Sequence, residues 1–256
     1  MRVTLLHNSS AGSEDHTDED LVETIRRAGH EVNGVVSNLD ELTATLRSCE
    51  SDLVAVAGGD GTVGRAACEL AGGRVPLAIL PLGTANNTAL TLGIRGKLIE
   101  LVSAWSRSQA VGFDLGTVTS ADVRMRFSEA VGWGVFPAVM HRAKRMSDPG
   151  ERRQTLERDR RLFQALLETA EPRPYEVEVD GEDFSGNYLM VEVLNIPFIG
   201  PRLELSPGSM PSDGHLELVL AGKSEKAGLL ELVRRGRTSE TPTQLAHRKA
   251  PGRALL

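Results

Sequence analysis

The chain has 256 residues, of which 40% are hydrophobic, and a formal net charge of −6. This length is enough to bury a substantial core, and it lies where one core tends to divide into two domains. The acidic balance gives no basic character for nucleic-acid binding, so we expect no nucleic-acid partner. Two cysteines are too few for a disulfide framework, and no apolar run is long enough to cross a bilayer. We therefore expect a cytoplasmic protein, either soluble or peripheral at the inner face of the membrane.

The first part of the chain alternates between strand and helix patterns. Strands are expected at residues 3–6, 30–36, 53–57 and 75–80, and helices at 17–28, 40–46, 63–70 and from 84 onward. The first helix has a start like a capping box, with Thr17 three residues before Asp20, and Gly29 stops it. This alternation predicts a parallel sheet covered on both faces.

The pattern changes after about Gly112. The segments from there on are strand-like, and several alternate as a half-solvated antiparallel sheet does; Tyr175, Val177 and Val179 of YEVEVDG lie on one face. A helical insert is expected at about 136–170, and the last 20 residues look loosely ordered. We predict an α/β N-terminal domain with a parallel sheet at 1–112 and a β-rich second domain at 113–256.

The third strand pattern ends in GGDGT and passes directly into a helix. Such a start leaves unpaired backbone N–H groups, which favour phosphate. Three glycines, Gly58, Gly59 and Gly61, let the backbone approach a ligand, and Thr62 can cap the helix or donate its hydroxyl to phosphate. Asp60 repels phosphate unless a metal or a proton lies between them, so it indicates Mg²⁺-dependent phosphoryl chemistry or a proton acceptor. The alternative is a glycine-rich turn with an aspartate cap.

The fourth strand pattern ends in PLGTANN, a second polar turn. Gly83 and Thr84 form the turn, while Asn86 and Asn87 offer carboxamides that can cap a helix or bind hydroxyls and phosphates. Loops at the carboxyl ends of neighbouring parallel strands face one crevice, and HNSSAG after the first strand adds a third polar loop at this edge. The grouping favours one ligand site over three unrelated caps.

These motifs resemble the diacylglycerol kinase catalytic-domain family, which includes bacterial lipid kinases and the sphingosine and ceramide kinases. The resemblance covers most of the chain and continues through FDLGTV, GWGVFPAVM and VLNIPFIGPRLELSPGSMPSDGHLELVL. GGDGT alone is moderately specific, because NAD kinases and phosphofructokinases carry it too. The resemblance implies an α/β domain like that of NAD kinase and diacylglycerol kinase, followed by a β-sandwich domain.

The resemblance also implies a kinase site that uses ATP and Mg²⁺ between the domains and a lipid substrate. The implied nucleotide-binding positions are Asn8, Gly12, Ser37, Gly58, Gly59, Asp60, Gly61, Thr62, Val63, Gly64, Thr84 and Asn86. Asp213 matches the aspartate proposed as general base in bacterial members, whereas the sphingosine-kinase branch assigns that role to the aspartate matching Asp60. We favour Asp213 as the base and Asp60 as organiser of Mg²⁺ and phosphate. The alternative for Asp213 is a plain turn residue, and a homodimer is left open.

Some positions depart from the family pattern. Asn87 stands where an aspartate is frequent, and the chain stops at HRKAPGRALL without the family's returning strand bearing Asp-Gly-Glu. These departures keep two alternatives open: a catalytically weak nucleotide-binding or regulatory homologue, and a soluble GGDGT kinase such as an NAD kinase. Residues 142–161 hold eight basic and four acidic residues beside an apolar stripe. This segment predicts either docking to an anionic bilayer or a helix packed on its own domain with a solvated arginine face.

Overall fold

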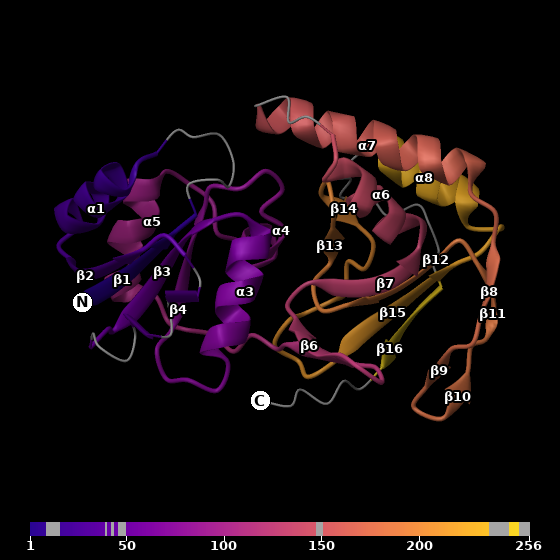
Figure 1. Ribbon diagram of the computed structural model, residues 1–256, viewed down its shortest axis with the longest axis horizontal. Helices are drawn as coiled ribbons and strands as arrows, with labels where there is room; N and C mark the ends of the chain where they lie inside the picture. The colour runs from indigo at the N-terminus through magenta and orange to yellow at the C-terminus, as the bar shows by residue number, and fades with distance from the viewer. Residues whose placement is uncertain are drawn as a thin grey trace. The chain divides into compact units, whose positions relative to one another are not determined.

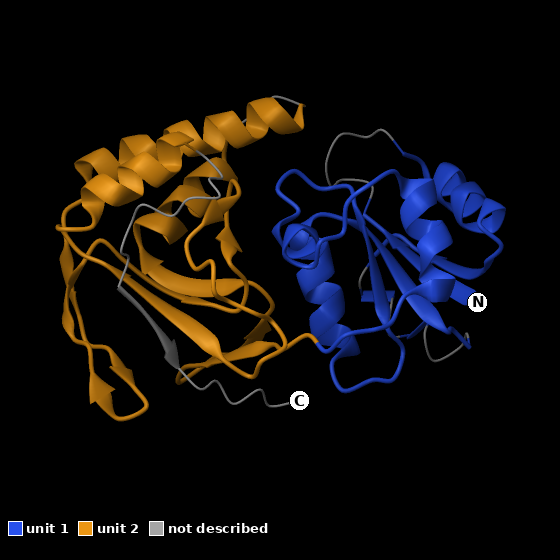
Figure 2. Ribbon diagram, turned by 180° about the vertical axis from the view of Figure 1, so that it is seen from behind, with its two compact units in different colours: residues 1–112, 256 blue, residues 113–255 orange. Residues whose placement is uncertain are grey.

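The computed structural model describes residues 1–8, 16–38, 40–41, 44–45, 50–146 and 151–235, and the backbone of 246–250. The chain forms two compact units, residues 1–112 and residues 113–255 (Figure 2). Each unit contains its own hydrophobic clusters.

The first unit is built on a four-stranded parallel sheet (Figure 1). Its strands are β1 (Arg2–His7), β2 (Glu31–Val36), β3 (Leu53–Gly58) and β4 (Leu77–Pro81), in the order β2-β1-β3-β4. All six residues of β3 are buried, as expected for a central strand covered on both faces. The predicted parallel α/β sheet is confirmed.

Helices cover both faces of this sheet. One face packs against α1 (Asp18–Arg27) and α5 (Leu98–Ala104), and the short turn η1 (Trp105–Arg107) follows α5. The other face packs against α3 (Asp60–Leu70) and α4 (Asn87–Thr91). The predicted capping box at Thr17 is present, and of the helix expected at 40–46 the described residues, 40–41 and 44–45, are helical.

The helix after GGDGT begins three residues earlier than the sequence pattern predicts. Gly59 is the N-cap of α3, without a side-chain cap bond, so the predicted cap by Thr62 is wrong. Asp60 occupies the first turn, where a carboxylate interacts favourably with the positive end of the helix dipole. This interaction favours a start at Asp60, as do the hydrogen bonds that the N–H groups of Thr62 and Val63 donate to the carbonyl of Gly59.

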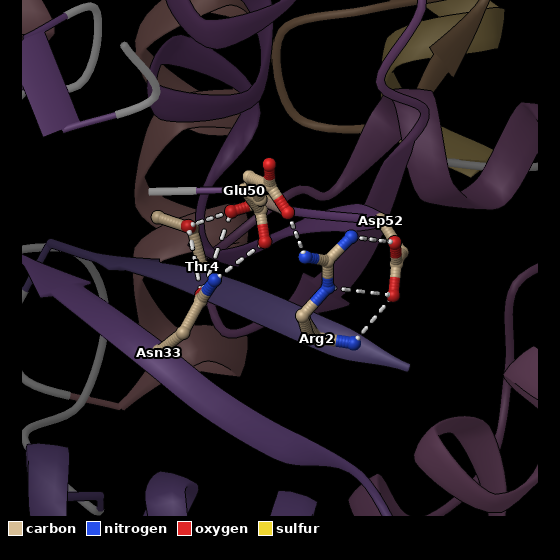
Figure 3. A network of polar contacts seen from close by, with 6 residues as sticks. Arg2, Thr4, Asn33, Glu50 and Asp52 are labelled. Carbon is tan, nitrogen blue, oxygen red and sulfur yellow. Dashed lines mark hydrogen bonds and ion pairs between the residues drawn. The ribbon is translucent and has the colours of Figure 1, made fainter. Parts of the chain in front are cut away.

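A polar network joins the amino ends of the strands (Figure 3). The backbone N–H of Arg2 donates to Asp52 Oδ2 at 2.8 Å, and its guanidinium donates to Asp52 Oδ1 at 2.9 Å and contacts Glu50. The side-chain hydrogen bond from Arg2 is the largest cause that lowers the pKa of Asp52 to about 2. Asn33 donates to the carbonyl of Glu50. The network therefore fixes the starts of β1, β2 and β3, at the edge opposite the glycine turns.

The second unit is built on a four-stranded antiparallel sheet. Its strands are β7 (Ala130–Gly134), β12 (Met190–Leu194), β15 (Leu216–Ala221) and β16 (Ala246–Ala250), in the order β16-β15-β12-β7. The paired ribbons are β5 (Gly116–Thr119) with β6 (Arg124–Phe127), β8 (Arg173–Tyr175) with β11 (Gly186–Tyr188), β9 (Glu178–Val179) with β10 (Glu182–Asp183), and β13 (Phe198–Ile199) with β14 (Leu203–Glu204). Because the backbone of β16 pairs with β15, the expectation of loose order is wrong for residues 246–250.

Three helices pack on one face of this sheet. They are α6 (Val135–Ala143), α7 (Arg152–Thr169) and α8 (Lys226–Arg235). The predicted helical insert is thus two helices, and α8 was not predicted. Phe163 and Leu167 of the apolar stripe on α7 are fully buried, so the stripe belongs to the core. This burial favours a helix packed on its own domain over a helix docked to a bilayer. No helix within the described ranges is long and apolar enough to span a membrane.

The opposite face of the sheet is covered by the β8 to β11 segment. Tyr175, Val177 and Val179 pack together against Val191 and Leu218 of the sheet. The predicted alternation is therefore correct, although the segment forms two short strands rather than one.

A carboxyl group lies on the helix-covered face of the second sheet. Glu192 of β12 is 1% exposed, and its Oε1 has no hydrogen-bond partner among the described residues. It fills the space above Gly132 of β7, where an added Cβ would lie 2.0 Å from Oε2. Burial raises the pKa of Glu192 from 4.5 to about 8. The side chain is therefore protonated near neutral pH in the folded protein.

We expect the Glu192 carboxyl to make stability fall as pH rises. The folded pKa is raised above the unfolded value, so unfolding releases a proton between pH 4.5 and about 8. At ~1.4 kcal/mol for each pKa unit, the stability lost across this window is on the order of several kcal/mol. Glu192→Gln should remove the loss, as measured by calorimetric melting from pH 5 to 9. The exposed Glu178→Gln variant is the control, and equal pH slopes for Glu192→Gln and wild type would contradict the assignment.

Candidate functional site

The two predicted glycine turns meet directly at the carboxyl edge of the first sheet. The carbonyl of Gly58 accepts hydrogen bonds from the N–H groups of Leu82 at 3.1 Å and Gly83 at 3.2 Å. A Cβ added to Gly83 would lie 2.2 Å from the Cα of Gly59. Only glycine fits at this crossing, because the obstacle is backbone that cannot move aside as a side chain would. The expected convergence of these two loops is present.

Asp60 ties the two turns together. Its Oδ1 accepts a hydrogen bond from the backbone N–H of Thr88 at 3.0 Å, in the first turn of α4. One carboxylate therefore stands in the first turn of α3 and caps the start of α4. This position fits the aspartate-cap alternative, and it also holds a negative charge at the predicted phosphate turn.

The asparagines of the second turn are both buried. Asn86 has a left-handed backbone (φ 53°), and its Nδ2 donates to the carbonyls of Pro81 at 3.1 Å and Gly83 at 2.8 Å. Asn87 is 2% exposed in the first turn of α4. The amide nitrogen of Asn86 thus closes the turn. Thr84 is half-buried and therefore more open to solvent than either asparagine.

The remaining predicted positions of this edge lie on β1, β2 and α3. Asn8 follows β1, and its Nδ2 donates to Thr62 Oγ1 at 3.0 Å, so the Thr62 hydroxyl holds the β1 loop instead of capping its helix. Val63 is 4% exposed, so its side chain cannot reach a ligand. Its N–H already donates to the carbonyl of Gly59. Gly64 is also buried. Gly12 lies outside the described residues.

Sequence reasoning missed a buried histidine at this edge. His7 ends β1, and its Nδ1 lies 2.5 Å from Oδ1 of Asp18, the first residue of α1. The hydroxyl of Ser37, a predicted nucleotide-binding position after β2, lies 3.5 Å from Asp18 Oδ2. Neither His7 nor Asp18 belongs to a spacing pattern, so only the fold brings them together.

In the second unit, Asp213 lies in the turn that leads into β15. Its Oδ1 accepts the N–H of His215 at 3.0 Å, as in a turn closed by its own side chain, and the side chain is 24% exposed. Asp114, which sequence reasoning did not single out, accepts the N–H of Gly214 through Oδ2 at 2.8 Å. The carbonyl of Asp114 accepts from Nδ2 of the buried Asn195. The signal for Asp114 and Asn195 was present in the FDLGTV and VLNIP motifs.

No three His, Cys, Asp or Glu side chains within the described ranges converge as a metal site. The Asp60 carboxylate could bind a divalent cation only together with further ligands, such as the oxygens of a bound phosphate. Mg²⁺ is commonly held in this way, by one or two carboxylates plus substrate phosphates. The residues present fit an ion that arrives with a nucleotide.

The backbone crossing makes Gly83 intolerant of a side chain. We expect Gly83→Ala to destabilise the first unit by at least ~2 kcal/mol, because an added methyl group meets the Gly59 backbone. Gly61→Ala is the matched control: an added Cβ there meets nothing within 4 Å, and alanine favours the helix by ~1 kcal/mol. Calorimetric melting measures both, and a Gly83→Ala midpoint equal to that of wild type would contradict the contact.

Comparisons with known proteins agree with this architecture. Residues 2–118 match the diacylglycerol kinase catalytic domain, and residues 131–243 match the YegS C-terminal NAD kinase beta sandwich-like domain. A crystal structure of a diacylglycerol kinase from Bacillus anthracis str. Sterne superposes with a TM-score of 0.69 at 20% identity, covering 97% of this chain and 83% of that one. The two-domain fold, a parallel α/β domain followed by a β-sandwich-like domain, is therefore shared.

Curated relatives cover most of the chain. A diacylglycerol kinase from Mycobacterium tuberculosis (strain CDC 1551 / Oshkosh) is 27% identical over 254 residues, which span 93% of this chain and 77% of the relative. A Citrobacter koseri protein named "Probable lipid kinase YegS-like" is 26% identical over 226 residues, 84% of this chain and 73% of the relative. With both domains matched in order, the chain belongs to the diacylglycerol kinase catalytic-domain family.

Proposed function

We propose that this protein is an ATP-dependent lipid kinase that transfers the γ-phosphoryl group of ATP to a lipid hydroxyl. Membership of the family supports a kinase, and the relatives named diacylglycerol kinase or lipid kinase support a lipid acceptor. The observation that carries the proposal is the junction of the two glycine turns, in which Gly59 crosses Gly83 and Asp60 bridges α3 to α4.

The start of α3 is suited to hold the phosphates. In the described part of the chain, the N–H groups of Asp60 and Gly61 have no protein acceptor, as is usual in the first turn of a helix. The glycine before them carries no side chain, so phosphate oxygens can approach these N–H groups at the positive end of the helix dipole. The nucleotide's phosphates therefore bind at the N-terminus of α3.

Asp60 would hold the metal that accompanies the nucleotide. Its Oδ1 is held by the N–H of Thr88, which fixes the orientation of the carboxylate. Bound Mg²⁺ would neutralise charge on the β- and γ-phosphate oxygens. Such an ion would make the negative charge of Asp60 compatible with phosphate binding.

Asp213 is the proposed general base. It accepts the proton of the lipid hydroxyl while that oxygen attacks the γ-phosphorus, and ADP leaves with the electron pair of the broken bond. The 24% exposure of the side chain supports access to the carboxylate. The acceptor lipid is diacylglycerol or a related lipid that presents one hydroxyl at a membrane surface, where the enzyme makes peripheral contact.

A catalytically weak nucleotide-binding homologue is the second candidate. It is favoured by the hydrogen bond that ties the Asp213 carboxylate into its own turn, and by the burial of Asn87 where the family often has an acid. This reading predicts ATP binding without transfer. A soluble kinase such as an NAD kinase would share the GGDGT turn and would phosphorylate a water-soluble acceptor.

Labelled ATP with a panel of acceptors separates the three functions. The acceptors are diacylglycerol, a sphingoid base, phosphatidylglycerol and NAD. We expect transfer to a lipid and none to NAD, with dependence on Mg²⁺. ATP binding with no transfer to any acceptor would replace the kinase proposal with the second candidate, and transfer to NAD alone would replace it with the third.

Replacement of the base should separate turnover from binding. Asp213→Asn keeps an oxygen that can accept the His215 N–H, so the turn persists, while turnover should fall by ~100-fold or more. ATP affinity, measured by calorimetry, should stay within about twofold, because the base acts on the hydroxyl. Asp180→Asn, at the exposed Asp-Gly turn between β9 and β10, is the control. Retained turnover in Asp213→Asn would refute this assignment.

Two substitutions of Asp60 distinguish its charge from its hydrogen bond. Asp60→Asn keeps an acceptor for Thr88 but removes the charge. We therefore expect stability to fall only by the ~0.5 kcal/mol of the lost helix-dipole interaction, and Mg²⁺-dependent ATP binding to weaken about tenfold. Asp60→Ala also removes the cap of α4 and should lower stability by ~1 kcal/mol. Equal Mg²⁺ titrations of wild type and Asp60→Asn would show that Asp60 serves only as a helix cap.

A further inference from the structure

The His7–Asp18 pair at the carboxyl edge of the first sheet is built to hold a carboxylate in place. His7 is 3% exposed and is fixed at the end of β1, while the Asp18 side chain is 39% exposed. The imidazole Nδ1 lies 2.5 Å from Asp18 Oδ1. The pair therefore has a buried anchor and an acceptor group that solvent or a ligand can reach.

The fold of α1 does not require this pair. Thr17 and Asp20 already form a capping box at the start of the helix, and Leu21 and Ile25 bury its apolar face. Substitution of Asp18 should consequently leave α1 in place. The Asp18 carboxylate thus pairs with a buried imidazole while its side chain stays 39% exposed, an arrangement that presents an oriented acceptor to a ligand.

The position of the pair suits the sugar of a nucleotide whose phosphates lie at α3. In the sheet order β2-β1-β3-β4, Ser37 follows β2, and β1 separates that strand from β3 and its glycine turn. Strands lie ~4.8 Å apart, so the ends of β2 and β3 are ~10 Å apart, with His7 at the end of β1 between them. A nucleotide extends over a comparable distance from phosphate to nucleoside. Asn8, which follows His7, donates a hydrogen bond to Thr62 of α3 and so links the His7–Asp18 pair to the proposed phosphate site.

The charge of this edge favours hydroxyls over phosphates. Asp18, Glu19 and Asp20 share the first turn of α1, and their carboxylates repel a phosphate that lacks a cation. Carboxylates accept hydrogen bonds well from sugar hydroxyls, and an acidic side chain has this task in dinucleotide-binding folds. The Ser37 hydroxyl beside Asp18 Oδ2 adds a second polar group for the same ligand.

We propose that Asp18, oriented by His7, accepts a hydrogen bond from the ribose 2′-hydroxyl of the bound nucleotide and selects ATP over 2′-deoxy-ATP. The inference rests on the proposed function, because it takes the start of α3 as the phosphate site. Beyond that function, it assigns Asp18 a role in nucleotide specificity.

Calorimetric titration of the full chain with ATP and with 2′-deoxy-ATP, both with Mg²⁺, tests the inference. Wild type should bind ATP about tenfold more tightly, as one hydrogen bond to a charged group implies. Asp18→Ala should weaken ATP binding by a similar factor and leave 2′-deoxy-ATP unchanged, and His7→Phe should reduce the preference in the same direction. Glu23→Ala, an exposed acid of the same helix, should behave as wild type.

The outcomes separate this inference from the kinase proposal. Equal affinity of wild type for the two nucleotides, or equal weakening of both by Asp18→Ala, overturns the ribose contact and leaves the kinase proposal standing. Preference for ATP without phosphoryl transfer supports the ribose contact and overturns the kinase. Binding of neither nucleotide overturns both.

Discussion

The close crossing of Gly59 and Gly83 is the constraint on which the candidate site depends. The backbones of the two turns are in contact there, so the position of one turn fixes the position of the other. Both turns also bond to one another through the carbonyl of Gly58. Because β3 is buried along its whole length, the crossing is fixed to the centre of the sheet. The starts of α3 and α4 are consequently placed beside each other, close enough for the Asp60 carboxylate to join them.

Several polar groups at this edge serve the fold as well as the proposed chemistry. Asp60 caps α4, Asn86 closes its own turn, and Thr62 holds Asn8. A side chain fixed by such a bond loses little conformational freedom when a ligand arrives, so its remaining polar atoms act at low entropic cost. The structural and functional interpretations of these residues are therefore compatible, and only substitutions that change charge without changing shape can separate them.

The sequence predicts the first unit well because its signals are local. Apolar runs that end in glycine turns mark β3 and β4, and the capping box marks α1. Their convergence follows from one rule, that parallel strands end at one edge of a sheet. The pairing of His7 with Asp18 has no such signal, since it joins a strand end to a helix start across a loop and depends on three-dimensional placement alone.

Prediction is weaker in the second unit because long-range packing overrides local pattern there. The arginine-rich stretch around α7 looks amphipathic enough for a membrane, yet Phe163 and Leu167 are buried against the sheet. Glu192 sits in an alternating strand at a position whose neighbours Met190 and Leu194 face the core. Only the absence of a side chain at Gly132 makes room for its carboxyl, and burial then keeps that carboxyl protonated. The ionisation state of Glu192 therefore depends on Gly132 of the neighbouring strand, and the sequence of either strand alone does not predict it.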